Sequence, residues 1–356
     1  SKLPRSTKIV ATIGTATDNQ KLIKDLIKTG VNVFRLNFSH GNHGDHLKRI
    51  SYIRSAEKEM NSNVAILADL QGPKFRIGRV KNESKVIKGS YYTFDKDPEI
   101  GDFKRVNLPH DEIFKSLSIG SNILMDDGKL QFKVKDISKD EIKTEVVVGG
   151  SIKSNKGLNL PDVVLNTSPL TSKDVEDLKF ILNQEIDWIA LSFVQKLKDV
   201  EEVKKYIANK AGVIAKIEKP SALKELNEII KACDCIMVAR GDLGVELAPE
   251  EVPGIQKEII LKCRQAGKPV IVATQMLESM IENYTATRAE INDIATAIFQ
   301  GADTVMLSAE SAVGRYPLQA VKTMSKTIIS TEKYKKEHIE DFKNKYHADL
   351  FFNTDI

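Results

Sequence analysis

Eight short apolar runs, rich in β-branched residues, alternate with segments of helical periodicity along this chain of 356 residues. Runs of this length, bounded by turn residues, are typical of strands that are buried on both faces of a parallel sheet. Eight strand–helix units are the number that closes a (β/α)8 barrel. The sequence therefore predicts an α/β fold built on a TIM barrel. The expected strands are 7–13, 31–38, 64–70, 187–194, 212–217, 234–239, 268–274 and 303–308.

The segments between these strands carry signals for where helices begin and end. The segment 18–30 has apolar residues at helical spacing and stops at Gly30, a residue type that commonly ends helices. Thr287 followed by Glu290 matches a capping box for a helix that runs through Phe299. Further helices are expected over 171–185, 223–233 and 317–332.

The alternation is interrupted once, between the third strand and its helix. The intervening stretch contains β-rich runs at 91–95 and 144–148, a turn signal at Asp127-Gly128, and no long helical pattern. It predicts an all-β domain inserted at the face of the barrel that carries active sites, where it would act as a lid. The expected domains are the first part of the barrel at 1–73, the lid at 74–168, the second part of the barrel at 169–335 and a C-terminal tail at 336–356.

Composition and charge argue against several classes of protein. The formal net charge is only +4 and the basic residues are spread along the chain, so no footprint for nucleic acid or an acidic membrane surface is present. The first residues lack the apolar core of a signal peptide, and no run reaches the length of a membrane span. Cys233, Cys235 and Cys263 lack metal-ligand spacing and are interpreted as small reduced hydrophobes. We therefore expect a cytoplasmic protein.

Charged and hydroxyl side chains follow most of the expected strands. In a barrel, the residues just past the carboxyl ends of the strands gather on one face. Glu218 and Asp242 follow neighbouring strands, and hard carboxylate oxygens with few other protein ligands suit Mg²⁺. Cations around such a metal are what phosphoryl transfer needs. The strand-end residues are Arg35, Asn37, Ser39, His40, Asp69, Lys74, Arg76, Lys216, Glu218, Asp242, Thr274, Ser308 and Glu310.

Six segments around these strand ends form an ordered set of motifs. They are VFRLNFSHG (33–41), LADLQGPKFRIG (67–78), AKIEKPSAL (215–223), MVARGDLGVE (237–246), VATQMLESM (272–280) and MLSAESAVGRYP (306–317). Together they closely resemble the pyruvate kinase family, from about residue 5 to residue 335. The resemblance implies a barrel with an inserted lid. It also implies a glycolytic phosphotransferase that moves the phosphoryl group of phosphoenolpyruvate to ADP, giving pyruvate and ATP.

The resemblance assigns roles to the positions that match the family motifs. Arg35 would contact the phosphoryl group of the substrate. Lys216 would stabilise both the moving phosphoryl group and the enolate that it leaves behind. Glu218 and Asp242 would hold a Mg²⁺ ion that bridges the phosphate and the substrate. The catalytic set implied in this way is Lys216, Arg35 and Thr274.

Further binding positions follow from the same resemblance. The backbone of Gly241 and Asp242, together with Thr274, would seat the substrate carboxylate, because backbone N–H groups at such a turn suit anions. A second Mg²⁺ would arrive with the nucleotide. The positions that match nucleotide contacts are Asn37, His40, Arg76 and Lys156. The residue that protonates the enolate is left open; candidates for an ordered water chain are Thr274, Ser308 and Glu310.

One motif departs from the family pattern beside the expected phosphate site. The segment 69–74 reads Asp-Leu-Gln-Gly-Pro-Lys, and Lys74 stands where K⁺-dependent members have a glutamate. Members with Leu, Gln and Lys at these places are the K⁺-independent type, and the ammonium of Lys74 would supply the charge of the ion. We therefore expect activity without K⁺. The positions that match K⁺ ligands elsewhere are Asn37, Ser39, Asp69 and Leu70, which would serve Lys74 or the nucleotide here.

The C-terminal end also departs from the pattern. The family usually continues past the barrel into a domain that binds effectors and forms one oligomer interface, whereas the last expected helix here is followed only by a short segment. A short form without the effector domain predicts hyperbolic kinetics and no activation by sugar phosphates. It also predicts a homo-oligomer that is a dimer through the barrel, not a tetramer.

Several polar groups have more than one interpretation. A zinc site at His40, His43 and His46 is rejected because their spacing matches no common ligand set. The resemblance places His40 near nucleotide phosphates, and we expect His43 and His46 to be solvated. The acidic segment 126–128 is interpreted as a turn instead of a metal site. Arg240 is expected to be structural and paired with a neighbouring carboxylate.

Two other functions share part of the pattern. A Mg²⁺-dependent aldolase or lyase would share the metal carboxylates, but it would not need Arg76, Lys156 and a lid for ADP. A non-catalytic relic that binds metabolites and regulates a partner would not need Lys216 and Thr274 beside the metal pair. A coupled assay with phosphoenolpyruvate, ADP and Mg²⁺ distinguishes the three functions.

Overall fold

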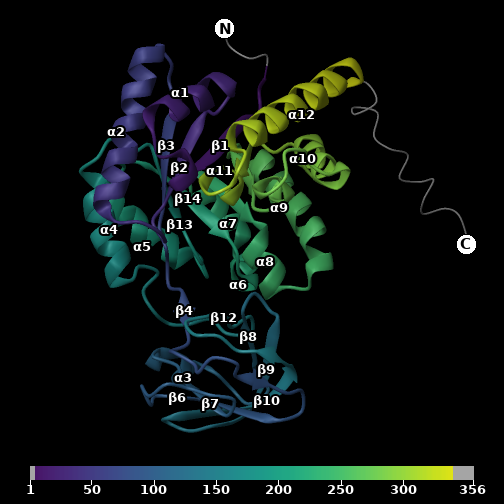
Figure 1. Cartoon of the computed structure of the whole chain (residues 1–356). Helices are drawn as coiled ribbons and strands as arrows, with labels where there is room; N and C mark the ends of the chain where they lie inside the picture. Colours follow the sequence, from purple (N-terminus) through teal and green to yellow (C-terminus); the bar gives the residue numbers. More distant parts are fainter. Residues whose placement is uncertain (1–4, 340–356) are drawn as a thin grey trace, which may run out of the picture. The chain divides into compact units, whose positions relative to one another are not determined.

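Eight parallel strands form a closed barrel in the computed structural model, which describes residues 5–339 (Figure 1). Neighbouring strands around the barrel follow the order β1-β17-β16-β15-β14-β13-β3-β2. Each lies within a range expected from the apolar runs, so the predicted TIM barrel is confirmed. The strands are β1 (Lys8–Ile13), β2 (Val33–Asn37), β3 (Ala65–Asp69), β13 (Trp188–Leu191), β14 (Gly212–Ile217), β15 (Cys235–Ala239), β16 (Val270–Ala273) and β17 (Thr304–Leu307).

The barrel strands are apolar because both of their faces are covered. All five residues of β15 and all four of β16 are buried, as expected for strands with a barrel interior on one face and helices on the other. The register between β14 and β15 pairs Ile214 with Cys235 and Ile217 with Val238. This register brings the residues that follow both strands to the same end of the barrel.

Helices connect the barrel strands, and most of the expected helix ends are found. The helix α1 ends at Gly30, whose φ of 134° lies outside the range of most side-chain-bearing residues. Thr287 and Glu290 form the expected capping box of α10. The helices around the barrel are α1 (Gln20–Thr29), α2 (His43–Met60), α4 (Ser172–Leu182), α5 (Leu197–Ile207), α6 (Pro220–Lys224), α7 (Leu226–Ala232), α8 (Arg240–Glu246), α9 (Val252–Ala266), α10 (Arg288–Gln300), α11 (Ala309–Ala312) and α12 (Pro317–Glu337).

Two helix predictions need correction. The single helix expected over 223–233 is two helices, α6 and α7, because Glu225 between them leaves the helical region with φ −118° and ψ 27°. The last helix, expected over 317–332, continues as α12 to Glu337. Of the expected tail at 336–356, the part from 340 onward lies outside the described residues.

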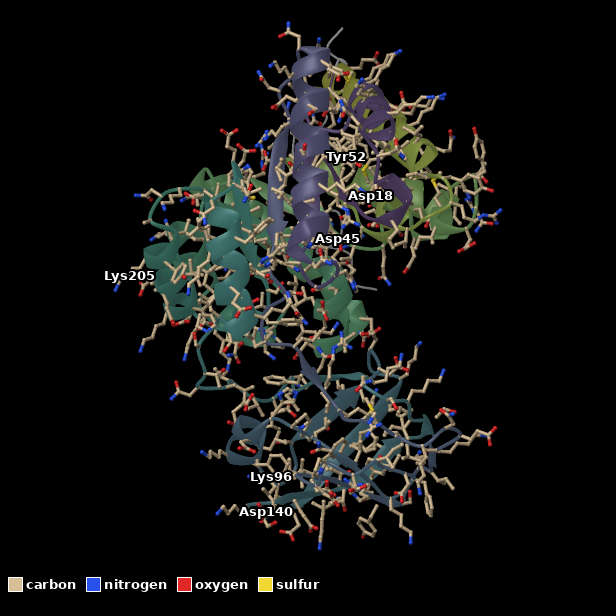
Figure 2. The ribbon with its side chains drawn as sticks, turned by 60° about the vertical axis from the view of Figure 1, so that its left-hand side comes forward. Asp18, Asp45, Tyr52, Lys96, Asp140 and Lys205 are labelled. Carbon is tan, nitrogen blue, oxygen red and sulfur yellow. The ribbon has the colours of Figure 1, made fainter. Side chains whose placement is uncertain are left out.

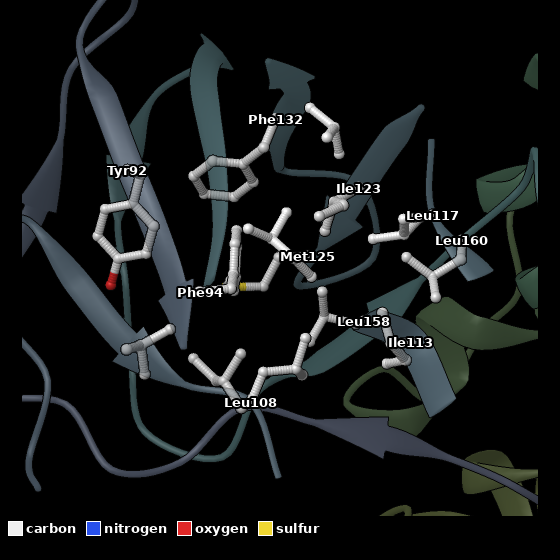
Figure 3. Packing of buried hydrophobic residues seen from close by; sticks show 14 of the residues in the cluster. Tyr92, Phe94, Leu108, Ile113, Leu117, Ile123, Met125, Phe132, Leu158 and Leu160 are labelled. Carbon is white, nitrogen blue, oxygen red and sulfur yellow. The ribbon is translucent and has the colours of Figure 1, made fainter. Parts of the chain in front are cut away.

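Between β3 and α4 the chain forms a β structure with its own core, called the insert (residues 74–168). Its strands form a seven-stranded sheet in the order β4-β12-β8-β9-β10-β6-β7 and a separate pair, β11-β5. The rings of Tyr92, Phe94 and Phe132 pack with centroids 5.2–5.5 Å apart at the centre of this core (Figure 3). The elements are β4 (Phe75–Arg76), β5 (Lys85–Val86), β6 (Tyr91–Asp95), β7 (Arg105–Asn107), α3 (Asp111–Ser116), β8 (Asn122–Met125), β9 (Leu130–Ile137), β10 (Glu141–Val148), β11 (Gly150–Ser151) and β12 (Gly157–Asn159).

The chain divides into two compact units. Among the described residues, the first unit contains 5–36, 41–67 and 263–339, and the second contains 37–40 and 68–262. The insert therefore groups with strands β13, β14 and β15, and the domain boundaries at 73, 168 and 335 stay a prediction. Over residues 5–339, no helix combines the length and the apolar character needed to cross a lipid bilayer.

Candidate active site

Lys216, near the end of β14, lies in a buried polar cluster of the second unit. Its Nζ is 3.2 Å from both Oδ1 and Oδ2 of Asp69 at the end of β3, and 3.0 Å from the Oγ of Ser192. The Oε1 of Glu218 lies 3.9 Å away. The Lys216 side chain is only 11% exposed, so a charged ammonium here needs these opposite charges. The cluster orients a cation at the strand ends.

Ser192 is a member of this cluster that the sequence analysis missed. Its Oγ donates to the carbonyl oxygen of Leu70 at 2.7 Å and lies 3.3 Å from Asp69 Oδ1. The serine follows β13 directly. Polar residues after six other strands were named from the sequence as site candidates. The same pattern after the fourth strand predicts Ser192 as a further candidate.

The expected metal pair, Glu218 and Asp242, also lies in the second unit. Glu218 is almost fully buried, and its Oε1 accepts a hydrogen bond of 2.8 Å from the backbone N–H of Phe193. Phe193 adopts a left-handed φ of 57°, which is costly for a bulky residue. Burial raises the pKa of Glu218 to about 8; the charge and hydrogen bond of Asp242 act in the same direction, and Lys216 opposes them.

The chemistry of this pair fits a divalent cation. Two carboxyls forced together in a buried place repel each other as ions, and a bound cation reverses that penalty. Over the described residues, no group of three or more His, Cys, Asp or Glu side chains gathers as a metal site. A two-carboxylate site leaves the remaining coordination positions to water and substrate oxygens, as Mg²⁺ prefers.

A cleft of about 190 Å³ in the second unit joins the insert to these strand ends. Its wall includes Lys74, Arg76 and Lys156 of the insert, and Phe193 and Asp242 of the barrel. The structure therefore brings three of the expected cationic residues to one surface, together with Asp242, which is one of the two expected metal ligands. A cleft of this charge suits a polyanionic ligand.

Two residues of the insert, Arg76 and Lys156, are expected to contact the nucleotide, and each already lies beside an oxygen atom of the protein. Arg76 Nη1 donates to the carbonyl oxygen of Asn155 at 3.0 Å, and Lys156 Nζ lies 3.4 Å from Asp126 Oδ1. Asp126 and the next residue both adopt left-handed φ values, in the turn expected at 126–128. The turn therefore supplies a counter-charge to Lys156.

The loop after β2, also in the second unit, carries two further residues that are expected to contact the nucleotide, Asn37 and His40. Asn37 Oδ1 accepts a hydrogen bond of 3.0 Å from the backbone N–H of Ser39, and His40 is exposed. Of the positions that match K⁺ ligands in other members, Asp69 contacts Lys216, and the Leu70 side chain is buried. Arg240 Nη1 lies 3.5 Å from the amide oxygen of Gln256 on α9.

Arg35 and Thr274 belong to the first unit. Arg35 Nη1 donates to Thr12 Oγ1 at 2.9 Å, and that hydroxyl donates to the carbonyl oxygen of Leu307. These bonds tie the guanidinium of Arg35, on β2, to the side chain of Thr12 on β1, which is itself bonded to β17. Thr274 follows β16 with a φ of 74°, and Gln275 follows with 59°. A β-branched residue in the left-handed region is strained, as is common at ligand sites.

Glu310 is a second buried carboxyl in the first unit. Its Oε1 accepts from the backbone N–H of Ser308 at 3.0 Å, and its Oε2 accepts from that of Leu277 at 3.1 Å. Burial raises its pKa above the usual value. The Oγ of Ser308 is buried and has no hydrogen-bond partner among residues 5–339, which leaves it available to a water or ligand.

One expectation about the histidines is wrong. His46 is only 1% exposed, whereas we expected it to be solvated. It lies on the inner face of α2, one turn before Arg49, whose Nε is 3.5 Å from Asp18 Oδ1. Asp45 and Tyr52, labelled in Figure 2, mark the start and the middle of this helix. Cys233, Cys235 and Cys263 are buried, as expected.

Comparison with known proteins identifies the family. The family model described as "Pyruvate kinase, barrel domain" matches residues 4–321. The chain belongs to the pyruvate kinase family. A pyruvate kinase of Agrobacterium vitis is 50% identical over 333 residues, which are 93% of this chain and 70% of that protein. A pyruvate kinase of Clostridium perfringens is 45% identical over 90% of this chain and 69% of its own length.

The fold agrees with that of a solved pyruvate kinase structure. The crystal structure of a pyruvate kinase from Cryptosporidium parvum matches with a TM-score of 0.89 and 38% sequence identity. The match covers 92% of this chain and 70% of that one. The barrel of the pyruvate kinase family is therefore present here.

Proposed function

We infer that the protein is a phosphotransferase that moves the phosphoryl group of phosphoenolpyruvate to ADP, giving pyruvate and ATP in glycolysis. The single observation that carries this function is the buried cluster of Lys216, Asp69 and Ser192 beside the carboxyl pair, in a chain that matches the family model over 4–321. Membership of this family also favours phosphoryl transfer over the alternative of an aldolase or lyase.

The chain's own residues have distinct roles in this reaction. Lys216, held by Asp69 and Ser192, would stabilise the charge on the moving phosphoryl group and on the enolate. Arg35, fixed by Thr12, would bind the phosphoryl oxygens. Glu218 and Asp242 would hold the Mg²⁺, which acts when bound as a Lewis acid towards phosphate and enolate oxygens.

The substrate carboxylate and the nucleotide would be bound by other groups. The backbone N–H groups of Gly241 and Asp242, with the Thr274 hydroxyl, would donate hydrogen bonds to the carboxylate of phosphoenolpyruvate. The shared cleft supports Arg76 and Lys156 as contacts to ADP phosphates, with Lys156 exchanging Asp126 for phosphate oxygens. The remaining proposed nucleotide contacts are Asn37 and His40, and a second Mg²⁺ accompanies the nucleotide.

The K⁺-independent type is part of this proposal. Lys74 lies in the wall of the same cleft as Arg76 and Lys156, where its ammonium would replace a monovalent ion. A dimer in solution and a cytoplasmic location complete the proposal. Sedimentation of a clear tetramer would contradict the dimer.

A lactate-dehydrogenase-coupled assay tests the function. We expect pyruvate formation that requires phosphoenolpyruvate, ADP and Mg²⁺ together. Aldol cleavage without pyruvate formation from phosphoenolpyruvate would replace the proposal by a lyase. Absence of both reactions, with metabolite binding retained, would indicate the regulatory relic.

A further inference from the structure

A buried ion pair connects the two segments that carry the expected metal ligands, Glu218 and Asp242. Lys219 directly follows Glu218, and Glu246 lies one helical turn after Asp242, at the end of α8. Lys219 Nζ is 3.2 Å from Glu246 Oε1, and the two side chains are 11% and 1% exposed. The pair therefore joins the end of the β14 segment to the helix that begins after β15.

A residue of the insert bonds to the same oxygen. The Asn159 side chain, on β12, donates from Nδ2 to Glu246 Oε1 at 3.1 Å. Lys219, Asn159 and Glu246 all line the cleft described above. The second carboxylate oxygen, Glu246 Oε2, is buried and lacks a hydrogen-bond partner within residues 5–339.

Stability alone does not account for this arrangement. Removing two charges from water is expensive, and a buried ion pair commonly contributes no more than well-packed apolar side chains of the same volume. An unpartnered carboxylate oxygen adds a further penalty. What a buried pair does provide is a fixed distance between two segments of backbone, because neither charge can leave its partner without remaining buried and unpaired.

We propose that Glu246 is a positioning residue that acts through Lys219, and that this ion pair sets the spacing between Glu218 and Asp242 before the divalent cation binds. The inference rests on the proposed function, because it takes these two carboxylates as the metal ligands. A divalent cation needs both groups as carboxylates, which repel each other until the cation lies between them, and the neighbouring ion pair opposes their separation. The two metal ligands are then already at the spacing that the cation needs, so less of the binding free energy is used to bring them together.

Direct metal binding tests the proposal without turnover. Mn²⁺, a spectroscopic substitute for Mg²⁺, is titrated into the full chain without nucleotide, and free Mn²⁺ is measured by electron paramagnetic resonance. We expect Glu246→Gln and Lys219→Met each to weaken Mn²⁺ binding about tenfold or more, and Lys219→Arg to stay close to the wild type. The double variant should bind no more weakly than the weaker single variant, because both substitutions remove one interaction.

Matched variants separate positioning from a general effect of charge or folding. Glu258→Gln makes the same substitution at an exposed residue of α9 that pairs with Lys262, and it should leave Mn²⁺ affinity unchanged. Circular dichroism and Tm report folding, and if Glu246→Gln does not fold, the comparison of Lys219→Met with Lys219→Arg carries the test. Glu218→Gln shows whether the metal site itself is correctly assigned.

The outcomes distinguish the two levels of the argument. Mn²⁺ affinity within twofold of the wild type in both Glu246→Gln and Lys219→Met overturns the positioning role. The same is true if Lys219→Arg loses as much affinity as Lys219→Met. If Glu218→Gln also keeps wild-type affinity, the metal assignment within the proposed function fails instead. Loss of affinity in Glu218→Gln alone leaves that assignment intact and rejects only the role of Glu246.

Discussion

Lys216 Nζ lies 3.2 Å from each carboxylate oxygen of Asp69, in a place where the lysine is nearly buried and the aspartate is fully buried. The ammonium is thus shared evenly between two oxygens and held in a single position. A cation fixed in this way needs little reorganisation when charge develops next to it, which is the property that electrostatic catalysis requires.

Asp69→Asn should lower kcat by about 10- to 100-fold, because it removes the carboxylate that lies closest to the buried Lys216 ammonium. Steady-state kinetics with phosphoenolpyruvate and ADP measure the effect. Asp177→Asn is a matched control: Asp177 is also buried and lies 2.6 Å from Lys173 Nζ on α4. The control should change Tm more than kcat. Equal kcat losses in the two variants would reject the role of Asp69.

Ser192→Ala should lower kcat about 5- to 10-fold, equivalent to one hydrogen bond of roughly 1 kcal/mol. The variant removes the hydroxyl that receives a hydrogen bond from Lys216 and donates one to Leu70. Ser325→Ala, at a buried serine of α12, serves as the control for loss of a buried hydroxyl. A kcat that matches this control would show that Ser192 only fills space.

Activity should be the same within about twofold when K⁺ is replaced by tetramethylammonium at constant ionic strength, an exchange that leaves screening unchanged. Lys74→Glu should lower the activity and make it respond to added K⁺, because the variant reverses the charge beside the expected phosphate site. The coupled assay in both salts measures this. A strong K⁺ requirement of the wild type would contradict the K⁺-independent type.

Thr274→Asn should raise the free energy of unfolding by about 1 kcal/mol, because asparagine tolerates the left-handed region better than a β-branched residue. The same variant should raise the KM for phosphoenolpyruvate through loss of the hydroxyl. Urea denaturation and kinetics measure the two effects. A variant that is both less stable and unchanged in KM would refute the assignment of strain at a binding position.

Glu310 should destabilise the fold increasingly as the pH rises from about 4.5, the ordinary pKa of a glutamate. Burial raises the pKa of Glu310, so the folded state holds its proton at pH values where the unfolded state has lost it, and stability falls through that window. Unfolding free energies of the wild type and Glu310→Gln at pH 4.5 and pH 7 measure this. The wild type should lose more stability relative to the variant at pH 7; a difference of opposite sign would reject the prediction.

The barrel could be predicted from the sequence because each strand is buried on both faces and so is apolar throughout. Glu218 and Asp242 could be proposed as a metal pair because carboxylates at the ends of apolar strands need a counter-charge; this pair stays a prediction. Ser192 and the Lys219–Glu246 pair were missed because their partners depend on side-chain contacts between different elements, which strand ends alone do not specify. His46 was missed for a different reason: its place at helical spacing before Arg49, Ile50 and Ile53 on the buried face of α2 was not considered.

The separate core of the insert has a consequence for how the chain folds. The backbone N–H of Gly72 donates to Asp174 Oδ1 at 3.1 Å, so the two ends of the insertion meet although 102 positions separate them. Closing a flexible loop of that length carries an entropic cost that grows with the logarithm of its length. If the insert condenses first around Tyr92, Phe94 and Phe132, the flexible chain left to close is short. The barrel then nucleates around a prefolded module, and its third and fourth strands meet at nearly the rate of an uninterrupted chain.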